Sequence, residues 1–192
     1  MIKSSGLEKI KTAVFISGRG SNLNNLIKFS KTRKSPILID LIVSNKKKAL
    51  GLKYAKKYKI KKKILDNKTK KDSEKVLLTI FKKRKIKLIC LAGFMQILSN
   101  SFIKRFKGKI INIHPSFLPK YKGLNTSVRA LNNNEKFSGC TVHYVTSRLD
   151  SGKIILQRKV KIKKTDSVKT LSAKVLSQEH KLYPAAINKI FN

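Results

Sequence analysis

Cysteine is scarce in this chain, and the two that occur argue against one kind of site. Cys90 and Cys140 each lie inside an apolar segment, and neither belongs to a Cys-x-x-Cys pair. A zinc site needs closely spaced ligands, so this spacing argues against one. The usage suits a reducing compartment, and we expect both cysteines to be small buried residues.

Long hydrophobic runs are also absent. No apolar run approaches the roughly 18 residues that cross a bilayer, and residues 1–8 lack the apolar core of a signal peptide. The sequence therefore predicts a cytoplasmic protein. With 192 residues and a hydrophobic content of 41%, the chain is long enough for one substantial core, and we expect residues 1–192 to form a single domain.

Acidic residues are few, 9 against 46 Lys and Arg, which gives a formal net charge of +37. Such a charge ordinarily favours a nucleic-acid partner, and a basic nucleic-acid-binding protein is the alternative from another class. Arginine is sparse, however, and the lysines are spread along the chain with many Asn and Ile, as expected when A/T-rich codons bias composition. Base readers concentrate arginine and stacking aromatics on one element. We therefore expect a solvated surface that attracts phosphates, with no specific nucleic acid and no membrane as partner.

Short apolar runs alternate with amphipathic segments, which predicts an α/β protein. Residues 88–94 are apolar throughout, as in a central parallel strand buried on both faces. We expect a single Rossmann-like open sheet, mostly parallel, with helices on both faces. The expected strands cover 12–17, 37–43, 88–94, 109–114 and 140–145, with a short extended piece at 64–65 and an outer strand pair within 154–162. The expected helices begin near residue 21 and span 49–58, 73–84, 99–106, 124–132 and 167–190, the last interrupted near Pro184.

Polar residues and prolines gather where the apolar run at 110–114 ends. Asn112 and His114 are two residues apart, and side chains alternate across a strand, so both point to the same face. Pro115 and Pro119 end regular structure directly after them. Open α/β sheets bind ligands at the carboxyl ends of their strands, so the sequence predicts a site here.

Other polar residues nearby invite comparison with known kinds of site. Asp150 follows the strand predicted at 140–145 and lies in a loop before Gly152, where a carboxylate gains little from solvation alone. His143 lies within that strand, and we expect a hydrogen-bonded core residue. No Gly-x-Ser-x-Gly sequence is present and Ser116 is surrounded by prolines, which argues against a serine-hydrolase triad.

The segment Gly-Arg-Gly-Ser-Asn at 18–22 joins a predicted strand to a predicted helix, as phosphate-binding loops do. Gly18 and Gly20 permit tight backbone conformations, and Ser21 and Asn22 can cap the helix while its free amides face an anion. By pattern alone, a merely structural turn fits as well. The third glycine of the dinucleotide fingerprint is missing.

Three segments resemble the folate-dependent formyltransferases: Asn-Ile-His-Pro-Ser-Phe-Leu-Pro-Lys-Tyr-Lys-Gly-Leu at 112–124, Thr-Val-His-Tyr-Val at 141–145 and Leu-Asp-Ser-Gly at 149–152. The resemblance runs from Ala13 to about Pro184. It implies transfer of the formyl group of 10-formyltetrahydrofolate to the amine of 5-phosphoribosylglycinamide, giving formylglycinamide ribonucleotide and tetrahydrofolate in de novo purine biosynthesis. It also implies formyl folate as co-substrate, no metal, and a monomer or homodimer.

The same superfamily contains methionyl-tRNA formyltransferase and formyltetrahydrofolate hydrolase. The tRNA enzyme carries an additional C-terminal domain that binds nucleic acid, and the hydrolase carries an N-terminal regulatory domain; we expect neither here. Gly-Arg-Gly-Ser-Asn at 18–22, together with Tyr-Lys-Gly-Leu at 121–124, favours the enzymes that act on the glycinamide acceptor.

The resemblance assigns catalytic roles to Asn112, His114 and Asp150. The amide can donate to the oxyanion of a tetrahedral adduct, and the imidazole can donate to the same oxygen and exchange protons near neutrality. The carboxylate can orient the imidazole or a water and accept positive charge from the amine. By pattern alone, 95–98 predicts core packing instead of a folate pocket. The acceptor and its phosphate are expected at Gly20, Ser21, Asn22 and Glu179, and the folate at Lys70, Met95, Gln96, Ile97, Leu98, Asn112, Thr146, Ser147, Arg148, Leu149 and Asp150.

Overall fold

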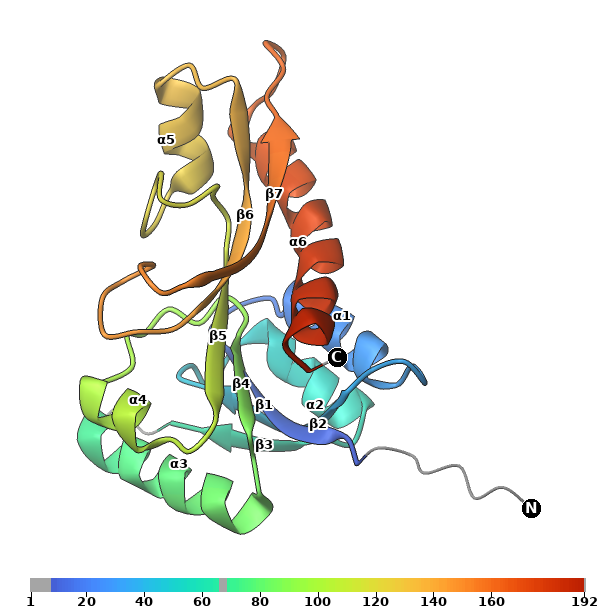
Figure 1. The fold of residues 1–192 in the computed structure, drawn as a ribbon, viewed down its shortest axis with the longest axis vertical. Helices are drawn as coiled ribbons and strands as arrows, with labels where there is room; N and C mark the ends of the chain where they lie inside the picture. Colours follow the sequence, from blue (N-terminus) through green and yellow to red (C-terminus); the bar gives the residue numbers. More distant parts are fainter. Residues whose placement is uncertain (1–7, 66–68, 192) are drawn as a thin grey trace.

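One open sheet of seven strands runs through the part of the chain that this computed structural model describes, residues 8–65 and 69–191 (Figure 1). The strands are β1 (Ile10–Ile16), β2 (Ile37–Ser44), β3 (Lys61–Ile64), β4 (Leu88–Leu91), β5 (Lys109–His114), β6 (Phe137–Tyr144) and β7 (Ile154–Lys161). Their order across the sheet is β3-β2-β1-β4-β5-β6-β7. Neighbours from β3 to β5 are parallel, and β6 and β7 continue the sheet in antiparallel pairs. The expected mostly parallel α/β fold is confirmed.

Helices cover both faces of the sheet (Figure 1). They are α1 (Ser21–Ser30), α2 (Lys53–Lys57), α3 (Lys70–Arg84), α4 (Asn100–Arg105), α5 (Thr126–Asn132) and α6 (Val168–Phe191), with a 3-10 turn at Leu50–Leu52. Alternation along β1 supplies both cores. Val14 and Ile16 pack with α1 and α6, while Ala13 and Phe15 pack with α3 and α4 on the opposite face.

Two expectations about helices are wrong. The pattern of the helix expected at 73–84 predicts Val76, Leu77 and Ile80 on its buried side. Val76 is instead 45% exposed, because the buried stripe of α3 is Leu77 and Phe81, one turn apart, and Val76 lies beside it. Helix α6 continues through Pro184 without interruption. Proline deprives the His180 carbonyl of its helical donor, and the Asn25 side-chain amide of α1 donates to that carbonyl at 2.7 Å instead.

The outer segment and the cysteines complete the comparison with sequence. Residues 154–161 form a single strand, β7, that pairs with β6, so the expected strand pair within this segment is wrong. Cys90 and Cys140 are fully buried free thiols in the sheet, as expected. Among the described residues, no helix is long and apolar enough to span a membrane, and no group of three or more His, Cys, Asp and Glu residues is placed to hold a metal.

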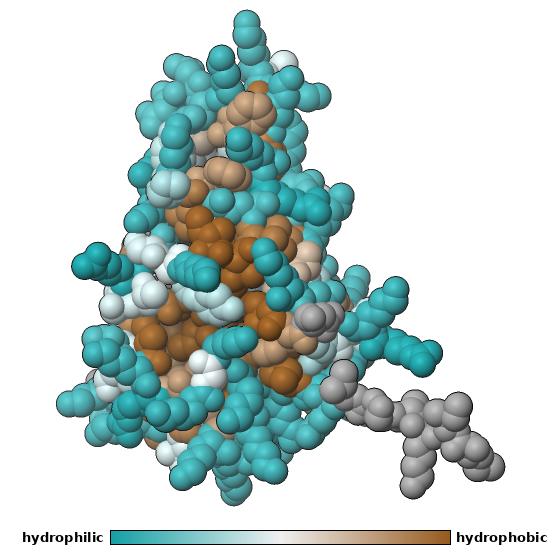
Figure 2. Space-filling view, in the orientation of Figure 1, coloured by the Kyte–Doolittle hydropathy of each residue, from teal (hydrophilic) through white to brown (hydrophobic). Residues whose placement is uncertain are grey.

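The surface agrees with the lysine-rich composition. Figure 2 shows hydrophilic side chains over the two ends of the visible face and hydrophobic side chains gathered in its middle.

The carboxyl ends of β1, β4 and β5, which are adjacent in the sheet, lead into the loops at 17–20, 92–99 and 115–125. The predicted site residues Gly20, Met95 and His114 therefore lie at the same edge of the sheet.

Candidate active site

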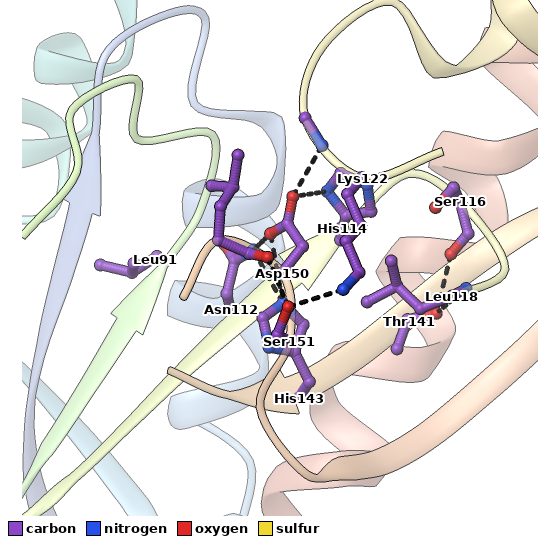
Figure 3. A network of polar contacts seen from close by, with 12 residues as sticks. Leu91, Asn112, His114, Ser116, Leu118, Lys122, Thr141, His143, Asp150 and Ser151 are labelled. Atoms are coloured by element: carbon purple, nitrogen blue, oxygen red, sulfur yellow. Dashed lines mark hydrogen bonds and ion pairs between the residues drawn. The ribbon is translucent and has the colours of Figure 1, made fainter. Parts of the chain in front are cut away.

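The cluster at the end of β5 is formed by residues from two strands and one loop (Figure 3). Asn112 and His114 point to the same side of β5, as their spacing predicted, and both approach Asp150. His143 lies opposite Asn112 on the antiparallel strand β6 and joins the same group. The predicted catalytic residues Asn112, His114 and Asp150 are thus brought together.

Asp150 lies at the centre of the cluster and is only 9% exposed. Its Oδ2 accepts a hydrogen bond from the Gly123 backbone N–H at 2.9 Å and lies 3.3 Å from His114 Nδ1. Burial raises the pKa of Asp150, but hydrogen bonding and the nearby histidines lower it further, so its pKa lies below the ordinary value. The carboxylate therefore stays ionised at neutral pH and favours a proton on a neighbouring imidazole.

The position of the His114 proton follows from its neighbours. Nε2 lies 2.9 Å from the backbone carbonyl of Tyr121, and since a carbonyl only accepts, Nε2 carries the hydrogen. In the neutral ring, Nδ1 then bears a lone pair toward Asp150. Desolvation lowers the pKa of His114, although the Tyr121 carbonyl and the Asp150 charge oppose it. The ring can thus accept a proton at Nδ1, where the carboxylate would stabilise it.

Sequence reasoning missed the part that His143 takes in this cluster. Its Nδ1 donates to the Tyr144 carbonyl at 2.8 Å, which leaves Nε2 free to accept from the Asn112 side-chain amide at 3.2 Å. The expected buried, hydrogen-bonded histidine is confirmed, with an exposure of 2%. Its contact with Asn112 depends on the register between β5 and β6, which one strand's pattern does not reveal.

Asn112 is oriented by these contacts. One amide hydrogen is held by His143, and the other faces Asp150 Oδ1 at the longer distance of 3.5 Å. A contact of that length is weak, so this amide hydrogen is the one available to donate a hydrogen bond to a ligand oxygen.

The expected acceptor loop lies between β1 and α1. Gly20 has a φ of 74°, and a Cβ there would lie 2.7 Å from the Cα of Gly51, so close packing requires glycine at this turn. The first helical hydrogen bond runs from Asn24 N–H to the Gly20 carbonyl, which leaves the amides of the preceding turn without helical acceptors. An anion can bind such amides.

The expectation that Ser21 and Asn22 cap this helix is wrong, because the N-cap residue is Gly20 and no side chain of the described residues forms a cap hydrogen bond there. Asn22 instead donates to Glu179 of α6 at 2.6 Å, and both residues are buried. Burial raises the pKa of Glu179 to about 7, although the bond from Asn22 opposes this. Asn22 Oδ1 is buried without a hydrogen-bond partner among the described residues. The loop and α6 are therefore joined by a buried polar contact.

The expected folate loop is divided between core and surface. Leu98 is 6% exposed and packs with α3 and α4, as core packing predicts, whereas Met95 and Ile97 are 60% and 61% exposed. An apolar rim is thereby presented at the sheet edge. Lys70 is the first residue of α3, and its side chain lies outside the described part of the structure.

The second expected folate segment, 146–150, leads into Asp150. Thr146, Ser147, Arg148 and Leu149 are exposed, and Leu149 is 53% exposed. Asp150 itself has a φ of 45°, in the left-handed region, and Gly152 packs against the Tyr144 carbonyl so closely that no side chain fits. These constraints hold the loop in a conformation that places the Asp150 carboxylate beside Asn112 and His114.

An amide donor beside a histidine–carboxylate pair, at the carboxyl edge of an open α/β sheet, suits an enzyme of acyl transfer. Residues 10–187 match the formyl transferase family, and the chain belongs to that family.

Named relatives agree with this assignment. The chain is 40% identical to phosphoribosylglycinamide formyltransferase of Haemophilus influenzae and 41% identical to that of Escherichia coli K12; the matches cover 92% and 91% of the chain, and 85% and 84% of the relatives. It is 40% identical to the human trifunctional purine biosynthetic protein adenosine-3, with 95% of the chain matched but only 18% of that protein spanned. The crystal structure of phosphoribosylglycinamide formyltransferase from Brucella melitensis superimposes with a TM-score of 0.90 at 39% identity, covering 95% of this chain and 96% of that one.

Proposed function

We propose that this chain transfers the formyl group of 10-formyltetrahydrofolate to the amine of 5-phosphoribosylglycinamide, giving formylglycinamide ribonucleotide and tetrahydrofolate. The observation that carries the proposal is the convergence of Asn112, His114 and Asp150 at one sheet edge. The identity to enzymes named for this acceptor, over most of their length, supports it. The role in purine biosynthesis and the cytoplasmic location belong to the same proposal.

The first step is attack of the amine nitrogen on the formyl carbon. The formyl oxygen gains negative charge. It accepts a hydrogen bond from the Asn112 amide hydrogen that points at Asp150 through the 3.5 Å contact. His143 holds the other hydrogen of the same amide, so the donor is oriented before the substrate arrives. Preorganised donors of this kind stabilise an oxyanion more than mobile water does.

The second step moves a proton. The attacking nitrogen loses one proton, and N10 of the folate gains one as its bond to the formyl carbon breaks. His114 can carry this proton on Nδ1, between the Tyr121 carbonyl on its far side and Asp150 on its near side. The site ends with the protonation it started with, and no further reactant is needed.

The two substrates occupy neighbouring loops in this proposal. The acceptor phosphate binds the free amides at the start of α1, with Gly20 and Ser21. The hydroxyls of the acceptor meet Asn22 and Glu179, where the buried Asn22 Oδ1 has no hydrogen-bond partner among the described residues. The folate lies along 95–98 and 146–150, with Lys70 nearby. The segment 146–150 contains Asp150, and the other two loops follow β1 and β4, which neighbour β5 in the sheet. This arrangement supports a meeting of the amine and the formyl group at the catalytic cluster.

The experiment that tests the proposal follows release of tetrahydrofolate from 10-formyltetrahydrofolate by the purified protein. Release is expected only when phosphoribosylglycinamide is added, and Asp150→Asn should abolish it. Equal release without acceptor would identify a hydrolase, and release dependent on initiator methionyl-tRNA would identify a tRNA formyltransferase. Either result would contradict the proposal.

A further inference from the structure

Ser17 lies between the two proposed substrate loops. It follows β1 directly, precedes the glycines of the acceptor loop, and is only 4% exposed. Its side chain does not contact the catalytic cluster through any bond that the described residues show. The polar contacts of this buried hydroxyl instead run sideways, to the ends of β2 and β4.

Two hydrogen bonds fix the hydroxyl. Its Oγ donates its single hydrogen to Asn45 Oδ1 at 2.7 Å and accepts the backbone N–H of Met95 at 2.7 Å. The Ser17 backbone N–H also donates to the Gly93 carbonyl at 3.0 Å. Because the donor is used on Asn45, the lone pairs of Oγ remain for Met95, so the two bonds have a defined direction. The folate loop is therefore attached to the strand that leads into the acceptor loop.

The far end of the folate loop is attached as well. Glu74 of α3, only 6% exposed, accepts from the Ser99 backbone N–H at 2.9 Å and from the Ser99 hydroxyl. Between these two attachments the loop exposes Met95 and Ile97. A segment held at both ends moves mainly when one attachment moves. Of the two attachments that the described residues show, the one at Ser17 lies on the acceptor side.

The acceptor side of this attachment is tightly packed. The Gly18 carbonyl accepts from the Gly51 N–H at 2.9 Å, and Gly20 and Gly51 are too close for any side chain between them. The segment 18–20 is therefore packed against Gly51 and continues directly into Ser17. We expect a phosphate bound at the start of α1 to act on this segment and, through the backbone, on Ser17.

We propose that Ser17 is a positioning residue that couples the two substrate sites, so that binding of the acceptor raises the affinity for folate and the reverse. This inference rests on the proposed function, because it takes 18–22 as the acceptor loop and 95–98 as the folate loop. Coupling between two sites is reciprocal, and commonly changes affinity by about 5- to 150-fold. A hydroxyl with a purely structural role would support folding and leave that factor unchanged.

The test measures binding of tetrahydrofolate, which carries no formyl group and cannot react, by calorimetry with and without saturating phosphoribosylglycinamide. The wild-type protein should bind tetrahydrofolate about fivefold or more tightly when the acceptor is present. Ser17→Ala should bring this ratio close to one while each ligand still binds alone. Asn45→Ala, which removes only the acceptor that orients the hydroxyl, should lower the ratio to an intermediate value.

Ser30→Ala is the matched control. Ser30 is also a buried serine, at the end of α1, but its hydroxyl donates only to the Ile27 carbonyl of its own helix, so the coupling ratio should stay at the wild-type value. A ratio near one in the wild-type protein would overturn the inference, as would a wild-type ratio in either Ser17→Ala or Asn45→Ala. Failure of the wild-type protein to bind either ligand would instead contradict the proposed function.

Discussion

Asn112 shows how the residues of the site are held before substrate arrives. Its two amide hydrogens point at His143 and Asp150, and Asp150 is held in turn by Gly123. Such a network keeps each group in one rotamer, which is what a preorganised site requires. In the proposed reaction, the formyl oxygen replaces a long contact and requires no rearrangement of the Asn112 side chain.

Asn112→Ala tests this directly. Loss of an oxyanion donor typically costs about 10²- to 10³-fold in kcat. We expect a decrease of that size in kcat with little change in KM for either substrate, because the donor acts on charge that develops only in the transition state. Steady-state kinetics on the purified variant measure it. A rise in KM with kcat intact would show that Asn112 serves ground-state binding instead.

Glu179 carries a pH-dependent cost. Its pKa in the folded chain is raised from 4.5 to about 7, so ionisation is opposed by the fold, and stability is lost as pH rises from about 4.5 through 7. One pKa unit corresponds to about 1.4 kcal/mol, so the loss is at most about 3.5 kcal/mol. Glu179→Gln removes the charge, and its side-chain oxygen can still accept from Asn22.

Urea unfolding at pH 5 and pH 8 tests this cost. The stability of Glu179→Gln relative to wild type should be higher at pH 8 than at pH 5, since both proteins share every other titrating group. The same relative stability at both pH values would show that the Glu179 carboxyl titrates normally.

At the scale of elements, α1 is joined to α6 by two asparagines one turn apart. Asn22 donates to Glu179, and Asn25 donates to the His180 carbonyl. The second bond compensates for Pro184, which has no N–H to offer that carbonyl. The acceptor loop is thereby fixed to α6, the helix that carries Glu179, the other residue proposed to bind the acceptor.

Asn25→Ala should leave the His180 carbonyl unpaired and lower the free energy of unfolding by about 1 to 3 kcal/mol. Pro184→Ala supplies a helical N–H to the same carbonyl, so Asn25→Ala should cost much less in that background. A double-mutant cycle by urea unfolding measures the difference. Equal costs in both backgrounds would mean that the bond does not compensate for the proline.

Sequence patterns predicted elements well where one residue type dominates a segment. The run at 88–94 gave a central strand because β4 is buried on both faces, and the two-residue spacing placed Asn112 and His114 together. What the patterns missed depends on distant partners. Asn22 does not cap α1 as expected but donates to Glu179, which is 157 residues away in the sequence. Helix α6 continues through Pro184, where the Asn25 side chain donates to the carbonyl that the proline leaves without a helical donor. Local propensity does not contain such contacts.

For the molecule as a whole, part of the basic surface lies at the carboxyl ends of helices, where it has a structural role. Every described α-helix has at least one basic residue in its last turn, including Lys82, Lys83 and Arg84 in α3 and Lys104 and Arg105 in α4. Cations there interact favourably with the negative end of the helix dipole. Charge distributed over separate helix ends differs from the concentrated basic element of a base reader.

That residues 1–192 constitute one domain stays a prediction.

Duplex DNA should therefore bind weakly, without sequence preference, and with strong dependence on salt. Fluorescence anisotropy with two unrelated duplexes, at low and at physiological salt, measures this. We expect equal affinities for the two duplexes and a steep loss of binding between the two salt concentrations. Tight binding of one duplex at physiological salt would contradict the interpretation of the charge as a solvated surface.

The central claim is that this site moves a formyl group between two specific molecules. The most direct measurement supplies 10-formyltetrahydrofolate with an isotope-labelled formyl carbon, together with phosphoribosylglycinamide, and follows the label by mass spectrometry. The label should appear in formylglycinamide ribonucleotide in an amount equal to the tetrahydrofolate formed, and it should not do so with Asp150→Asn. Label recovered as free formate, with the acceptor unchanged, would contradict the account.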